Sequence, residues 1–264
     1  LISGIKRGVA DVKKSAAAAE ATERTEKDLS FKVVLLGIAA VFVLMVALYF
    51  YFTNVLGGAL LFWRDGAPTD IVQSLGCRFT DAGSAFELGW GMPRAEVPTQ
   101  WLTPQRTAAI PGAALLIRRR TFWDLGGFDS GDFAYLEDVH LCWRAWLAGG
   151  EVWLVPSAVC WHSYGATAGG RVSPLRVRLM QRNRYANMVK LLGPLTLITG
   201  LVTSLGYDLY RMLEYVARGR WEGLRALATG TFEAAGRLPV WWRARRRIQS
   251  TRRSSDKEQR DAGF

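Results

Sequence analysis

Hydrophobic residues are spaced in three different ways along this chain of 264 residues, and the first pattern is an unbroken run. The stretch from Val33 to Phe52 contains no charged side chain. About twenty apolar residues are enough to span the hydrocarbon core of a bilayer. A buried core helix is the alternative, but such a helix rarely lacks a polar face over about five turns. We therefore predict a transmembrane helix over residues 31–53, preceded by a polar and basic arm over residues 1–30.

The second pattern, over residues 57–170, alternates short apolar runs with one amphipathic stretch, as in a globular α/β domain. Ala113–Ile117 is an apolar run between Pro-Gly and three arginines, which predicts a buried strand. Leu136–Ala148 carries an apolar stripe at helical spacing and ends at two glycines, which predicts a helix. Val152–Val155 and Ala158–Trp161 are predicted strands separated by a proline.

The third pattern, over residues 171–250, is helical and strongly basic. Leu191–Tyr210 is apolar but interrupted by glycines, and it carries no charge before Asp208. Two interpretations stay open for it: a second membrane span, or a helix that lies in the plane of the membrane or re-enters it. The tail over residues 251–264 is polar, and we predict that it is disordered.

The formal net charge of +11 is concentrated in the last third of the chain. Residues 57–170 hold eight basic and eleven acidic side chains, whereas residues 171–253 hold seventeen and four. Such a cationic surface attracts phosphates, either of nucleic acid or of anionic lipid. No groove-reading or base-stacking motif is recognisable. Trp221, Trp241 and Trp242 lie among arginines, which favours a membrane interface. We therefore expect anionic membrane lipid as a partner, and no nucleic acid.

Candidate chemistry is concentrated around two adjacent carboxylates, Glu137 and Asp138, at the start of the predicted helix. Helix capping alone could account for them, because exposed backbone N–H groups favour carboxylates there. The alternative is a general base, which the helix N-terminus would keep ionised by lowering its pKa. His162 follows a predicted strand and could ligate a metal or only form a structural hydrogen bond. His140 is expected on the polar side of the helix, facing solvent or lining the acceptor site.

Two further positions, Gly127 and Phe128, precede this helix in the sequence Gly-Gly-Phe-Asp. The glycine and the aromatic ring could simply end a helix and enter the core. Glycine at such a point also permits close approach of the backbone to a ligand.

These residues fall into a recognisable order of motifs. The order is Pro111-Gly112-Ala113-Ala114-Leu115-Leu116-Ile117, Gly126-Gly127-Phe128-Asp129, Glu137-Asp138-x-x-Leu141-x-x-Arg144, Trp153-x-x-Pro156, His162-x-x-Gly165-x-Thr167 and Arg182-Asn183. Over residues 57–190 the chain resembles the acceptor-side half of bacterial family 2 glycosyltransferases, the rhamnosyltransferase-like group.

The resemblance implies a GT-A (Rossmann-like) fold and inverting transfer of a sugar from a nucleotide-sugar to a cell-envelope polysaccharide or glycolipid acceptor. It implies Asp138 as the catalytic base, Glu137 as its neighbour that positions the acceptor, and His162 as a ligand of a divalent metal, Mg or Mn. The substrate-binding positions that we carry over are Gly112, Gly127, Phe128 and Arg144. In the intact family the catalytic part lies on the cytoplasmic side of a membrane.

The chain departs from this family in two ways. His140 stands where the family usually has Asp. In addition, no Asp-x-Asp occurs before Ala113, and residues 1–56 stand where the family has its nucleotide-binding strands. We therefore expect a partial GT-A half-domain that does not transfer sugar by itself.

The N-terminal segment has its own, weaker resemblance. Residues 22–30, leading into the apolar run, resemble an internal segment of oligopeptide-transporter family membrane proteins. Basic residues precede the run, so the positive-inside rule places the N-terminus in the cytoplasm and residues 57 onward on the other side. A transporter fragment joined to an unrelated enzyme piece is therefore the alternative interpretation, and a membrane location is expected for either.

Overall fold

The computed structural model describes residues 55–65, 67–163 and 173–261. The chain divides into two compact units, Leu1–Tyr51 and Phe52–Phe264, and the description concerns the second. The arm predicted at 1–30 and the transmembrane helix predicted at 31–53 lie outside the described residues. Within the described ranges, no helix combines the length and the apolar character needed to cross a membrane.

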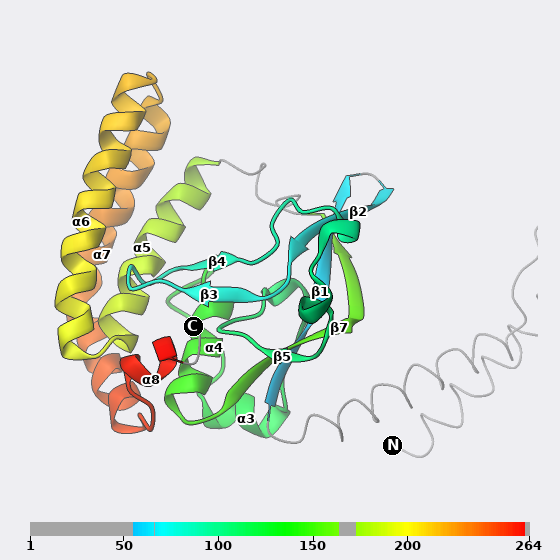
Figure 1. Ribbon diagram of the computed structural model, residues 1–264. Helices are drawn as coiled ribbons and strands as arrows, with labels where there is room; N and C mark the ends of the chain where they lie inside the picture. Colours follow the sequence, from blue (N-terminus) through cyan, green and yellow to red (C-terminus); the bar gives the residue numbers. More distant parts are fainter. Residues whose placement is uncertain (1–54, 66, 164–172, 262–264) are drawn as a thin grey trace, which may run out of the picture. The chain divides into compact units, whose positions relative to one another are not determined.

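The main sheet has five strands in the order β2-β1-β7-β5, with β6 paired to β1 (Figure 1). The strands are β1 (Val55–Asp65), β2 (Ala67–Ser74), β5 (Gln105–Arg106), β6 (Leu115–Leu116) and β7 (Glu151–His162). Only the pair β1 and β7 is parallel, and the other pairs are antiparallel. A separate ribbon joins β3 (Cys77–Phe79) to β4 (Ala85–Glu87). The described unit therefore has the mixed α/β character that the sequence predicts.

Two strand predictions need correction. The strands expected on either side of Pro156 form one strand, β7, whose register against β1 shifts at this point: Ala59 pairs with Val155, but Leu60 pairs with Val159. Proline has no N–H to donate, so a bulge accommodates it without ending the strand. The strand expected over Ala113–Ile117 is reduced to the two residues of β6, because a 3-10 turn, η3 (Gly112–Ala114), occupies its first part.

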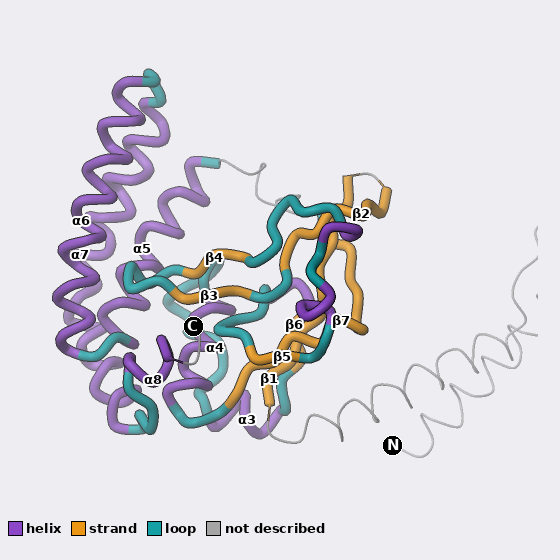
Figure 2. The backbone as a smooth tube through the Cα atoms, viewed as in Figure 1, coloured by secondary structure: helices purple, strands orange, loops and turns teal. Residues whose placement is uncertain are grey.

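Apart from the last, the shorter helices lie between strands along the chain, and the long helices α5, α6 and α7 follow the last strand (Figure 2). They are η1 (Arg94–Glu96), η2 (Thr99–Leu102), α3 (Arg119–Asp124), α4 (Glu137–Leu147), α5 (Pro174–Leu191), α6 (Pro194–Ala217), α7 (Trp221–Ser250) and α8 (Asp256–Asp261). Helix α4 confirms the prediction for Leu136–Ala148. Helices α5, α6 and α7 lie together on the side of this unit away from β2.

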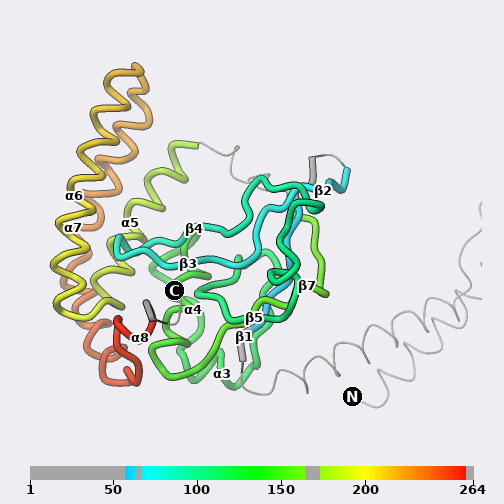
Figure 3. Tube along the Cα trace, viewed as in Figure 1, coloured from blue at the N-terminus to red at the C-terminus, as the bar shows by residue number. Residues whose placement is uncertain are grey.

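The sequence predicts a disordered tail over residues 251–264, but part of it is folded. It turns back to the C-terminal end of α4 and forms α8 beside it (Figure 3). The indole N–H of Trp143 donates to Gln259 at 3.0 Å, and a carboxylate oxygen of Asp256 accepts from the backbone N–H of Gly193 at 2.7 Å. These contacts with buried partners explain why a polar segment folds here.

Helix α4 is the centre of the hydrophobic core. Every residue from Val139 to Leu147 is buried, including Leu141 and Leu147. The sequence predicted a single apolar stripe, but α4 contacts β7 and also α5, so both of its faces are covered. Each fully buried Leu contributes about 1.5–3 kcal/mol relative to exposure. The core therefore fixes the position of α4, and with it the two carboxylates at its first turn.

Helix α5 is buried although it is rich in polar residues, and its side chains therefore need partners. Asp208 of α6 supplies three of these contacts. Its carboxylate accepts hydrogen bonds from the guanidinium of Arg184 at 2.6 Å, the amide of Gln181 at 2.6 Å and the hydroxyl of Tyr185 at 2.7 Å. A buried charge that is shared in this way holds α6 against α5.

Replacement of Asp208 by Ala should lower the free energy of unfolding by about 3–5 kcal/mol, because a buried guanidinium loses its counterion. Urea denaturation measures the loss. Glu214→Ala on the same helix is the control: Glu214 pairs with the exposed Arg218 four residues away, and such a pair is worth about 0.3–0.5 kcal/mol. Similar losses in the two variants would contradict the assignment of Asp208 as the anchor.

Candidate active site

A pocket of about 730 Å³ opens at the N-terminal end of α4. Its wall combines segments that are far apart in the sequence, from β2, β4, η3, α4, β7 and α5. The polar residues that matter for the chemistry are Gln73, Glu87, Gly112, Glu137, Asp138, His162 and Arg176. Four of the residues predicted from the sequence, Gly112, Glu137, Asp138 and His162, are therefore brought together.

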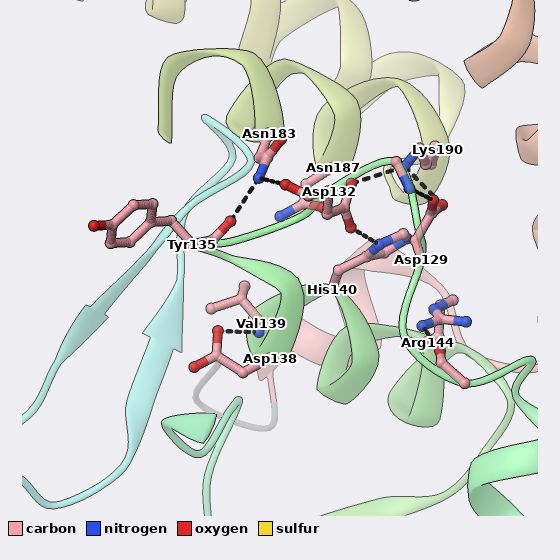
Figure 4. Close-up of polar contacts among 12 residues, drawn as sticks. Asp129, Asp132, Tyr135, Asp138, Val139, His140, Arg144, Asn183, Asn187 and Lys190 are labelled. Atoms are coloured by element: carbon pink, nitrogen blue, oxygen red, sulfur yellow. Dashed lines mark hydrogen bonds and ion pairs between the residues drawn. The ribbon is translucent and has the colours of Figure 1, made fainter. Parts of the chain in front are cut away.

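Asp138 is fixed by two backbone N–H groups. Its Oδ2 accepts from Gly112 at 2.7 Å, and its Oδ1 accepts from Val139 at 2.7 Å, the second bond being drawn in Figure 4. Burial raises the pKa of Asp138, although these backbone bonds act in the opposite direction. The expected lowering of the pKa by the helix N-terminus is thus wrong, because loss of water outweighs it. A carboxylate with a raised pKa is a stronger base when it is ionised.

Two further carboxyl groups in the pocket have raised pKa values. Burial and then repulsion by Asp138 raise the pKa of Glu137 to about 7. Burial also raises the pKa of Glu87 to about 7. A hydrogen bond from Gln73 at 3.4 Å acts in the opposite direction but is the weaker effect. Sequence reasoning missed Glu87, since it lies on the short strand β4 within a loop-rich stretch, far from the recognisable motifs. Nothing in the local sequence distinguishes it from a surface glutamate.

His162 ends β7 at the wall of the pocket. Its Nδ1 lies 2.9 Å from Oε1 of Gln73, and partial burial lowers its pKa. The ring is therefore neutral near pH 7, which is the form that can ligate a metal. Its predicted role as a metal ligand stays a prediction.

The loop ahead of α4 has an unusual backbone. Phe133, Tyr135 and Leu136 all have positive φ values, of 61°, 67° and 65°. The left-handed conformation costs about 1–2 kcal/mol for each such residue. Asn183 of α5 is buried and holds the loop with its side-chain amide (Figure 4). That amide donates to the carbonyl oxygens of Asp132, Ala134 and Tyr135, at 2.8, 2.9 and 2.7 Å. Asn183 therefore determines where α4 and its carboxylates begin.

A second polar cluster lies behind this loop (Figure 4). Asp129, Asp132 and His140 are close enough together to ligate a metal ion. The ammonium of Lys190 already lies among them, 2.9 Å from Asp129 and 3.3 Å from Asp132. Burial acts against ionisation, yet Lys190 lowers the pKa of Asp129 to about 2. We interpret the cluster as a buried ion-pair network in which a lysine supplies the cation.

His140 belongs to this network, and its expected position facing solvent or acceptor is wrong. Its side chain is fully buried, and its Nδ1 lies 2.6 Å from Oδ2 of Asp132. Burial lowers its pKa. The reason is that α5 covers the side of α4 that the sequence pattern leaves polar.

The remaining predicted substrate-binding residues lie away from the pocket. The guanidinium of Arg144 donates to the carbonyl oxygens of Leu125 and Gly127, both at 2.5 Å. Phe128 packs edge-on against Phe122, with ring centroids 5.5 Å apart. Arg144 and Phe128 line a different cavity. The contacts of Arg144 and Gly127 shape the turn after α3, and their part in substrate binding stays a prediction.

Several known proteins resemble parts of this chain in sequence. Residues 97–243 match the family described as glycosyl transferase family group 2. N-acetylgalactosaminyltransferase 6 of Drosophila melanogaster is 30% identical over 81 residues, which are 30% of this chain and 12% of that protein. N-acetylglucosaminyl-diphospho-decaprenol L-rhamnosyltransferase of Mycobacterium tuberculosis is 39% identical over 75 residues, which are 28% of this chain and 22% of that protein. A crystal structure of GalNAc-T7 with UDP, GalNAc and Mn²⁺ aligns with 52% of this chain and 26% of its own, at a TM-score of 0.38 and 19% identity.

The described unit is mixed α/β, and carboxylates line a pocket at the N-terminus of α4. The family match covers more than half of the chain, and the chain belongs to glycosyl transferase family group 2. The matched segments span less than a quarter of the length of either curated relative. The resemblance noted in the sequence is thereby confirmed at the level of the family.

The raised pKa values of Glu87 and Glu137 predict a dependence of stability on pH. A carboxyl group whose pKa rises from 4.5 to about 7 on folding stabilises the folded state at low pH. This contribution is lost as the pH rises through about 7. The free energy of unfolding should therefore decrease between about pH 5 and pH 8, and less so in Glu87→Gln, which cannot ionise. Urea denaturation at several pH values measures it, with the exposed Glu96→Gln as the control. An identical pH slope in Glu87→Gln and the wild type would refute the prediction.

Proposed function

We propose that this chain carries the acceptor side of the active site of an inverting glycosyltransferase, with Asp138 as the base. The observation that supports this proposal most is the position of Asp138, a half-buried carboxylate held by two N–H groups in a pocket. As the acceptor oxygen bonds to the anomeric carbon, its proton passes to Asp138. The bond from that carbon to the nucleotide diphosphate breaks, and the diphosphate leaves.

Exposed aromatic side chains at the pocket favour a sugar as the group bound there. Phe86, Trp90 and Phe133 line it and are substantially exposed, so their faces can stack on the C–H face of a sugar ring. Glu137 lies beside Asp138, and its carboxylate can accept a hydrogen bond from a second hydroxyl group of the acceptor sugar. The name of the mycobacterial relative describes a lipid-linked acceptor. For this chain we propose a lipid-linked sugar or a cell-envelope polysaccharide as the acceptor class, and hexosyl or rhamnosyl transfer.

We propose that a divalent metal, Mg or Mn, binds at one side of the pocket, where His162 and Glu87 both contact Gln73. The neutral ring of His162 and the carboxylate of Glu87 would be its ligands from this chain, and a nitrogen ligand suits Mn better than Mg. When bound, such an ion would neutralise the charge of the leaving diphosphate. The chain has no Asp-x-Asp ahead of Ala113. We therefore propose that the donor nucleotide-sugar needs further ligands and that the residues of this chain do not suffice for turnover.

The surface of α6 supports the proposal that the enzyme works at a membrane. Its three charged residues, Asp208, Arg211 and Glu214, are buried or half-buried, so no charge lies among its exposed positions. Those exposed positions include Leu195, Ile198, Val202, Leu205, Leu209 and Leu213. Their spacing of three or four residues forms a continuous apolar stripe. A stripe of this kind on a helix that does not span the bilayer fits the surface of a lipid layer.

Charge favours anionic lipid as the occupant of this stripe. The exposed charged residues of the α6–α7 hairpin are seven arginines and one glutamate. They are Arg218, Arg220, Arg225, Arg237, Arg243, Arg246, Arg247 and Glu222. Arginine beside an apolar stripe adds attraction to anionic headgroups. We propose a location at the cytoplasmic face of a membrane. The alternative of a transporter fragment rests on residues outside the described ranges.

Asp138→Asn, made in the complete product of the gene that encodes this chain, should lower sugar transfer by about 10²–10⁴-fold, because a general base contributes that much. Transfer of radiolabelled sugar to membrane lipid or polysaccharide measures it. Asp124→Asn is the matched control, since Asp124 is an exposed carboxylate on α3 that pairs with Arg120. Asp138→Asn with the activity of the control would remove Asp138 as the base.

An environment-sensitive fluorophore at position 205 should enter the lipid when the full chain is reconstituted in anionic vesicles. It is attached to Leu205→Cys after Cys160, the cysteine that is not fully buried, is changed to Ser. The emission should shift to the blue and be quenched by lipid-borne quenchers. The same label at the exposed Leu102 on η2 is the control. Equal emission and quenching at both positions would contradict contact between α6 and lipid.

A further inference from the structure

A second, larger cavity of about 1170 Å³ is formed by α3, the C-terminal half of α4 and the last turns of α7. None of its lining residues lines the pocket of Asp138. The chemistry proposed for Asp138 does not use it, although Arg144 and Phe128, which the family resemblance predicts to bind substrate, are in its lining. Its charged lining consists of four arginines and three carboxylates, namely Arg144, Arg247, Arg252, Arg253, Asp124, Asp129 and Glu151.

Each of the three carboxylates forms an ion pair with a cation that does not line the cavity. Asp129 pairs with Lys190 at 2.9 Å, Asp124 with Arg120 at 3.6 Å and Glu151 with Arg106.

The arginines are not compensated to the same degree. Arg252 pairs with Asp256, whereas Arg144, Arg247 and Arg253 form no ion pair with a carboxylate of the described residues. Burial lowers the pKa of Arg144, Asp129 and Asp132 act in the opposite direction, and Arg247 adds to the lowering. Guanidinium groups around one cavity that form no ion pair attract an anion, and guanidinium geometry suits phosphate oxygens.

Two buried polar atoms of the lining have no hydrogen-bond partner within the described part of the chain: Nε of Arg144 and Nε2 of His140. Nε of Arg144 is a donor. His140 directs Nδ1 at the carboxylate of Asp132, so Nδ1 carries the proton and Nε2 is left as an acceptor. A buried polar group without a hydrogen-bond partner destabilises the fold. A ligand with an anionic oxygen and a hydroxyl group would satisfy both atoms.

We infer that this cavity binds a phosphate ester that also carries a hydroxyl group, such as a sugar phosphate. Arg144, Arg247 and Arg253 hold the phosphate, and Nε2 of His140 accepts the hydroxyl proton in a hydrogen bond. The volume is sufficient for a ligand of this size. The site does not rest on the proposed transferase function, because it shares no lining residue with the pocket of Asp138.

Isothermal titration of the full chain in detergent with glucose 1-phosphate tests the site. The wild type should bind, and Arg247→Gln combined with Arg253→Gln should weaken the affinity by about tenfold or more, since charge-assisted hydrogen bonds are lost. Both side chains are exposed at the cavity rim, so the fold should be retained. Arg243→Gln combined with Arg246→Gln is the matched control on α7, outside the cavity, and should retain the affinity of the wild type.

Absence of binding by the wild type, or equal weakening in the two double variants, would overturn the site. Asp138→Asn should bind glucose 1-phosphate as the wild type does, which separates this result from failure of the proposed function. Vesicles that contain phosphatidylinositol provide the second arm. If these vesicles displace glucose 1-phosphate, the natural phosphate belongs to a lipid headgroup. If they do not displace it, the natural ligand is a soluble phosphate ester. Either result supports phosphate binding in the cavity.

Discussion

The ion-pair network of Lys190 with Asp129 and Asp132 is the interaction on which the active-site pocket depends. It joins α5 to the loop that precedes α4. Removing one member of a buried ion pair costs about 3–5 kcal/mol, because the other charge is left without a partner. Asn183 lies about two turns earlier in α5 and acts on the same loop, where its amide donates to the carbonyl oxygens of Asp132, Ala134 and Tyr135. The helix start, and therefore Asp138, is placed by α5.

This dependence explains the unusual composition of α5. A helix that contacts α4, α6 and α7 would ordinarily be apolar on most of its surface. Here it buries Gln181, Arg182, Asn183, Arg184, Asn187 and Lys190. Each of these positions orients another part of the unit, so packing and polar positioning are performed by the same helix. The basic charge of the last third is in part internal, and most of its exposed arginines lie on the α6–α7 hairpin.

The sequence predicts the secondary-structure elements better than the tertiary contacts of their side chains. Helix α4 follows from its apolar spacing and its terminal glycines, and the motif order around Asp138 is enough to assign the family. Tertiary contacts decide what the local pattern cannot. His140 occupies a polar position of the helix, yet α5 covers it. Asp138 lies at a helix N-terminus, yet burial raises its pKa. Glu87 enters the pocket only because β3 and β4 form a ribbon beside it.

The central claim is that Asp138, with its raised pKa, takes the proton from the acceptor hydroxyl. The most direct test is the pH dependence of kcat/KM for sugar transfer by the complete gene product in the Glu137→Gln background, which removes the neighbouring titration. A base must be ionised to act, so the rate should rise with pH through an apparent pKa above the ordinary Asp value of about 3.9. A rate that is constant above about pH 4 and shows no acidic limb would contradict the account.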